Sequence, residues 1–76
     1  MEVRIMKISD SSFIGDDGKE VVGKHIYVMP VMGGNKQRLF FSADRLLNMA
    51  YDPVVGDVVY VVVNELGRTV ELLKLN

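Results

Sequence analysis

The stretch "KQRLFFSADRLLNMAYDP", residues 36–53, contains a change in hydrophobic period that decides the fold of this chain. Its first part, residues 36–41, predicts a strand in which Leu39 and Phe41 share one face. From Ser42 onward the apolar residues recur at the spacing of a helix, and Ser42 is a suitable N-cap. The Asp-Pro pair at the end of the stretch terminates this helix. We therefore expect a strand followed directly by one short helix.

Strand-like segments lie on both sides of the helix. We expect five strands, three before the helix and two after it, at residues 2–8, 21–31, 36–41, 58–63 and 69–75. The alternation of the first strand slips at Met6, which predicts a β-bulge or a bend. Gly23 interrupts the second strand, as expected where a strongly bent strand needs a residue without a side chain. Glycine-containing turns separate most of the segments.

The predicted order of elements is β-β-β-α-β-β, so the fold class is all-β with one short helix. Five strands with a helix between the third and the fourth are typical of the OB-fold barrel. We therefore predict a single five-stranded OB-like domain over residues 1–76. The alternatives are an SH3-like barrel, which also has five strands, and a five-stranded sheet with a packed helix.

Composition restricts the class of protein. Hydrophobic residues make up 49% of the chain, which is enough to fill a compact core. The chain contains no cysteine and no apolar run of membrane-spanning length, so we expect a cytoplasmic protein without a membrane partner. The net charge is −1, yet residues 18–45 carry five cations against two acids. This basic middle segment is either a hint about a partner or chance scatter.

No complete catalytic motif is present. Gly18, Gly23 and Lys24 match the spacing of a phosphate-binding P-loop, but His25 replaces the hydroxyl residue and a valine-rich strand replaces the helix. His25 is the single histidine and has no triad-like partners. Asp16 and Asp17 do not meet the spacing of a calcium loop. We therefore expect a binding protein rather than an enzyme, with no metal ion and no cofactor.

The predicted strand faces bring cations and aromatic rings together. If Ile26, Val28, Leu39 and Phe41 fill the barrel, their neighbours in sequence lie outside on adjacent strands. Such a surface binds single-stranded nucleic acid, because cations follow the phosphates and rings stack on the bases. The alternative is that Tyr27 and Phe40 are packing residues of a strand buried on both faces. The predicted nucleic-acid-binding residues are Lys19, Lys24, His25, Tyr27, Lys36, Arg38 and Phe40.

Two stretches carry a resemblance to a known family. "GDDGKEVVGKHIYVM", residues 15–29, is a Gly-Lys turn that leads into an aromatic-bearing strand, and "GDVVYVVVNELGRTVELLKL", residues 56–75, forms a closing hairpin. Together with the order of elements, they resemble the small single-stranded DNA-binding (helix-destabilising) proteins of filamentous phages and related mobile elements. The resemblance implies a dimeric OB-fold that coats single strands during DNA replication without sequence preference. Lys24, Tyr27, Arg38 and Phe40 match the kinds of residue that such proteins use.

Our prediction is therefore a homodimeric protein that binds single-stranded DNA, with single-stranded RNA as the alternative ligand. Independently of the family, apolar surface on the strand at residues 58–63, or on Leu72, Leu73 and Leu75, offers a dimer contact. The alternative is that the helix covers this outer face. The alternative from another class is a protein-interaction or assembly module of a phage or mobile element, with no role in nucleic-acid binding.

Overall fold

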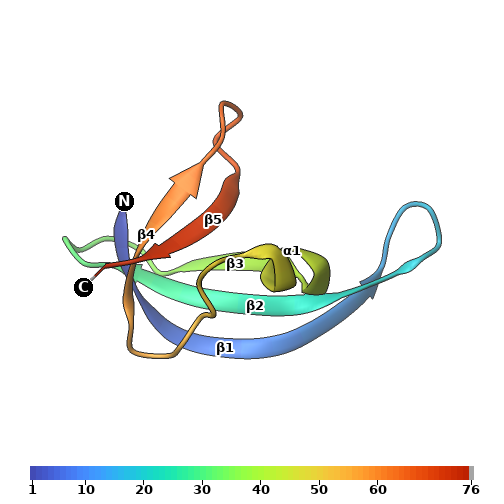
Figure 1. Cartoon of the computed structure of the whole chain (residues 1–76), viewed down its shortest axis with the longest axis horizontal. Coiled ribbons are helices and arrows are strands. Elements are labelled where there is room, and N and C mark those ends of the chain that lie inside the picture. Colours follow the sequence, from blue (N-terminus) through green and yellow to red (C-terminus); the bar gives the residue numbers. More distant parts are fainter. Residues whose placement is uncertain (76) are drawn as a thin grey trace.

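The computed structural model describes residues 1–75 and confirms the predicted order of elements. Within these residues it contains one short helix and five strands (Figure 1). The strands are β1 (Glu2–Ile14), β2 (Glu20–Pro30), β3 (Gln37–Ser42), β4 (Val58–Val63) and β5 (Thr69–Lys74), and the helix is α1 (Ala43–Asn48).

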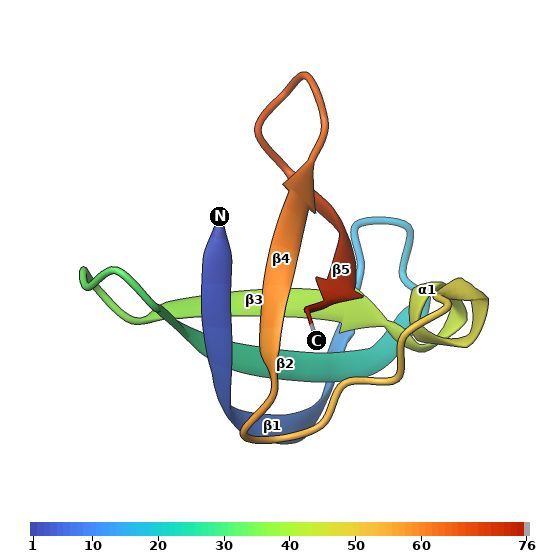
Figure 2. The same ribbon diagram turned by 60° about the vertical axis from the view of Figure 1, so that its left-hand side comes forward.

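All five strands belong to one antiparallel sheet with the order β3-β2-β1-β4-β5. The sheet is strongly coiled, so that β4 and β5 run across the direction of β2 and β3 (Figure 2). β3 and β5 are its two edges, and within residues 1–75 no ladder joins them. The fold is therefore mostly β, with a single five-stranded sheet and one helix.

β1 is longer than the segment expected from its hydrophobic pattern. It continues from residue 8 to Ile14 because the polar residues that follow pair with β2 along their whole length, ending at Ile14 opposite Glu20. The Gly15 N–H donates to the Lys19 carbonyl at 2.8 Å and closes the turn. Backbone hydrogen bonds in a ladder do not depend on side-chain polarity. The alternation of apolar residues therefore underestimated the length of this strand.

The core lies on one face of the sheet. It consists of eight buried apolar residues: Val3, Ile5, Ile26, Val28, Phe41, Val59, Val61 and Leu72. Three of the four residues expected to fill the interior are fully buried, and Leu39 packs against them from the edge. Helix α1 lies near β2 and β3 and contributes Leu46 to the margin of the core. Burial of a large side chain such as Phe41 stabilises the fold by about 1.5–3 kcal/mol.

The two predicted irregularities occur in the structure. The pairing of β1 with β2 shifts between Ile5 and Lys7, which confirms the bulge at Met6. Gly23 lies where the backbones of β2 and β3 come very close. A Cβ atom at this position would collide with the Phe41 carbonyl oxygen and would lie 2.8 Å from both Phe40 Cζ and Ser42 Cα. The bend of β2 therefore requires a residue without a side chain here.

We predict that Gly23→Ala lowers the free energy of unfolding by about 1–3 kcal/mol, because an added methyl group forces the paired strands apart. The matched control is Gly15→Ala, whose Cβ would find its nearest neighbour at 3.3 Å, on the side chain of Asp17. Urea denaturation of both variants measures the difference. Equal midpoints for the two variants would contradict the close approach at Gly23.

Tyr51 anchors the connection between α1 and β4. Its hydroxyl donates to Asp57 Oδ2 at 2.7 Å and accepts from the Val54 N–H at 3.1 Å. Burial, and after it the hydrogen bond to Asp57, raises the pKa of the Tyr51 phenol above its usual value. The folded state therefore holds the phenolic proton more tightly than the unfolded state does.

We predict that Tyr51→Phe lowers the free energy of unfolding at neutral pH by about 1 kcal/mol, because the Asp57 and Val54 groups lose their partner. Since the pKa is raised on folding, this contribution is complete below about pH 10 and is lost as the pH rises further. The stability difference between wild type and variant should shrink in denaturation curves recorded at alkaline pH. A stability difference that stays constant above that pH would count against a raised pKa of the partly buried phenol.

Candidate nucleic-acid interface

The ladder register places the predicted aromatic and basic residues in rows across β1, β2 and β3. One row is Lys7–Tyr27–Arg38, and the next contains His25 and Phe40. Tyr27 lies between buried Ile26 and Val28 in sequence, so its side chain is on the opposite face of the sheet from the core. The outer face therefore brings together residues that are separated in the chain.

Four rings form a continuous surface on this outer face. The ring centroids of Phe13 and Phe40 are 5.3 Å apart, those of Phe40 and His25 are 5.4 Å apart, and those of His25 and Tyr27 are 6.4 Å apart. The Phe13–Phe40 and Phe40–His25 pairs, inclined by 62° and 64°, have the favourable edge-to-face arrangement, and the His25–Tyr27 pair is tilted by 57°. The missing side chain at Gly23 leaves the space that the Phe40 ring occupies.

Cations lie at the Tyr27 end of this surface. Lys7 Nζ is 5.5 Å from the centroid of the Tyr27 ring, and Arg38 stands opposite Tyr27 on the other side. Both cations are exposed. No acidic residue occurs among the paired outward-facing residues from Lys7 to Phe13 and their partners on β2 and β3. We call this surface the aromatic–basic strip, which consists of Lys7, Phe13, His25, Tyr27, Arg38 and Phe40.

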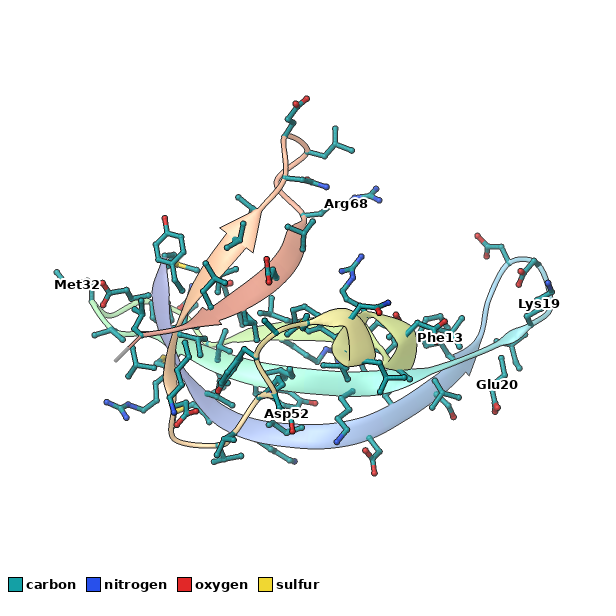
Figure 3. All side chains as sticks on the ribbon, in the orientation of Figure 1. Phe13, Lys19, Glu20, Met32, Asp52 and Arg68 are labelled. Carbon is teal, nitrogen blue, oxygen red and sulfur yellow. The ribbon has the colours of Figure 1, made fainter. Side chains whose placement is uncertain are left out.

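The strip rings do not belong to the core, which was the alternative interpretation of the sequence. His25, Tyr27 and Phe40 are half-buried against one another, and none of them is in the buried cluster. Phe13 is 48% exposed (Figure 3). The ring edges and parts of the faces are therefore accessible to a ligand.

Sequence reasoning missed Lys7 and Phe13. The predicted first strand ends at residue 8 and so leaves out Phe13, and the bulge at Met6 sets the face on which Lys7 lies. After Met6, every second residue from Lys7 to Phe13 faces outward, opposite Tyr27, His25 and their neighbours. Residues 9–12, "SDSS", are all polar, so no hydrophobic alternation in the sequence extends the strand to Phe13.

The structure does not bring the other predicted cations into the strip. Lys24 faces the opposite side of β2, where it lines a groove with Leu46, Leu47 and Asp52. Lys19 lies in the turn at the tip of the β1–β2 hairpin (Figure 3). Lys36 lies in the loop directly before β3. Of the seven predicted residues, the strip therefore contains His25, Tyr27, Arg38 and Phe40.

Comparisons with known proteins do not assign this chain to a family. No family model, curated protein or solved structure matches it. Within residues 1–75 no helix is both long and apolar enough to cross a membrane. The same residues contain no group of three or more His, Asp or Glu side chains arranged to hold a metal ion.

Proposed function

We propose that this chain binds single-stranded DNA without sequence preference, through the aromatic–basic strip. The observation that supports the proposal most strongly is the row of four contacting rings with Lys7 and Arg38 at one end and no acid among them. Stacking on a ring is worth about 1–3 kcal/mol per base and tolerates any base. A duplex offers no free base faces, so the strip favours single strands.

We further propose that the sheet is an open OB-like barrel rather than an SH3-like one. In OB-folds the face formed by the second and third strands binds oligonucleotides. The strip occupies this face, with additional residues from β1. The position agrees with the resemblance to helix-destabilising proteins of phages and mobile elements, and the absence of cysteine agrees with a cytoplasmic location.

We predict that the protein binds a fluorescein-labelled oligo-dT with a Kd on the order of micromolar at low salt. Tyr27→Leu and Phe40→Leu should each weaken binding about 5- to 150-fold, because each removes a stacking surface. Arg38→Ala and Lys7→Ala should each weaken binding and reduce the slope of log K against log salt by about 0.7. Fluorescence anisotropy at several salt concentrations measures both effects.

The matched control is Lys24→Ala, which removes the same charge from the opposite face of β2 and should leave oligo-dT binding unchanged. Equal affinity for an oligo-U of the same length would show that the strip does not distinguish RNA from DNA. Absence of binding at low salt, with protein at tens of micromolar, would overturn the proposal. The alternative function, a protein-interaction or assembly module, would then remain.

We also propose that the chain is a homodimer that uses the outer face of the β4–β5 hairpin. Tyr60 and Leu73 stand opposite each other on this hairpin and are 45% and 44% exposed, and Leu66 at its tip is 78% exposed. Exposed apolar side chains that adjoin one another commonly mark an interface. Two linked strips would bind one DNA strand more tightly than either strip alone, because the second contact becomes intramolecular.

We predict that wild type sediments as a dimer and that Leu73→Glu sediments as a monomer, because the added charge opposes burial of this face. The control is Leu47→Glu, which places the same charge on an exposed leucine of α1. Sedimentation velocity of the three proteins at the same concentration provides the measurement. A wild type that is monomeric at high concentration would exclude the dimer.

A further inference from the structure

The β4–β5 hairpin is joined to the rest of the sheet along a short boundary. β4 pairs with β1 through Glu2–Tyr60, Val3–Val59 and Arg4–Val58, and the Val61 N–H donates to the Met1 carbonyl at 2.9 Å. By contrast, β1 and β2 pair over most of their length. The hairpin projects away from the other strands in both views (Figures 1 and 2). We call this short boundary with β1 the hinge.

Besides the core packing and the bonds to β1, Arg45 makes a hydrogen bond between the hairpin and the remainder of the fold. Its side chain reaches from α1, and Nη1 donates to the carbonyl of Thr69, the first residue of β5, at 3.1 Å. The guanidinium carbon is 5.9 Å from the centroid of the Phe41 ring. Ser42 Oγ accepts from the Arg45 N–H at 3.3 Å and fixes the start of the helix. Within residues 1–75 no other hydrogen bond joins α1 to the hairpin.

We propose that the hydrogen bond from Arg45 to the Thr69 carbonyl controls opening of the β4–β5 hairpin at its boundary with β1. While this bond is present, α1 and the beginning of β5 are held together across the open side of the sheet. When the guanidinium leaves the Thr69 carbonyl, the hairpin is held by its hydrogen bonds to β1 and by the packing of Val59, Val61 and Leu72 in the core. Arg45 thereby sets how often the edges of β3 and β5, and the apolar side chains beneath the hairpin, are available to another chain.

The alternative is that Arg45 merely stabilises the whole fold. The two cases differ in which backbone amides become exposed, because local opening of the hairpin transiently breaks only the bonds that join it to β1. These bonds include those donated by the N–H groups of Ile5, Gly56 and Val61, at 2.8–2.9 Å. The amides that join β1 to β2 stay protected in a local opening and lose protection only on global unfolding.

The test is amide hydrogen exchange, followed by NMR, of wild type, Arg45→Met and Arg68→Met. Methionine keeps a long apolar stem but has no donor, and Arg68 is an exposed arginine directly before Thr69 that controls for lost charge. In Arg45→Met, the amides of Ile5, Gly56 and Val61 should exchange about 5- to 10-fold faster, as expected for the loss of one hydrogen bond. The β1–β2 amides should be unchanged.

Arg45→Lys provides a second variant, since it keeps a cation and a donor at the end of a flexible stem. Its exchange at the hinge amides should lie between those of wild type and Arg45→Met. Unchanged exchange at the hinge in Arg45→Met, or an equal increase at the β1–β2 amides, would overturn the proposal. An equal effect of Arg68→Met would also overturn it.

Discussion

The β-bulge at Met6 is the constraint on which both the core and the strip depend. Before it, Val3 and Ile5 of β1 point into the core beside β4. After it, the outward positions fall on Lys7 and on every second residue that follows. A strand without the extra residue would keep one parity throughout and would exchange its outward and inward faces beyond residue 6. Because of this one inserted residue, β1 contributes Val3 and Ile5 to the core at one end and Lys7 and Phe13 to the strip at the other.

The elements themselves follow from local patterns in the sequence. The change of period after Phe41 predicted the short helix, and the alternation of Ile26 and Val28 predicted which face of β2 is buried. These predictions held because the core needs apolar side chains at alternate positions of a half-buried strand. Closure between β3 and β5 could not be predicted, because it depends on the coiling of the whole sheet rather than on any one segment.

The candidate site was predicted only in part. The residues that were missed or wrongly included each have a physical reason. Arg38 and Phe40 were placed together because they lie two residues apart on one strand. Phe13 and Lys7 were missed because they reach the strip through pairing between strands, which the composition of a single segment does not reveal. Lys24 was included for its charge, although the alternation of β2 places it on the opposite face from His25.

The three tyrosines of this tryptophan-free chain lie in three different environments. Tyr27 belongs to the strip, Tyr51 is hydrogen-bonded to Asp57 within the α1–β4 connection and packs against the core, and Tyr60 is on the outer face of the β4–β5 hairpin. The chain therefore carries a natural set of intrinsic fluorophores, and retaining one tyrosine at a time would assign emission changes to ligand, core or hairpin without any attached dye.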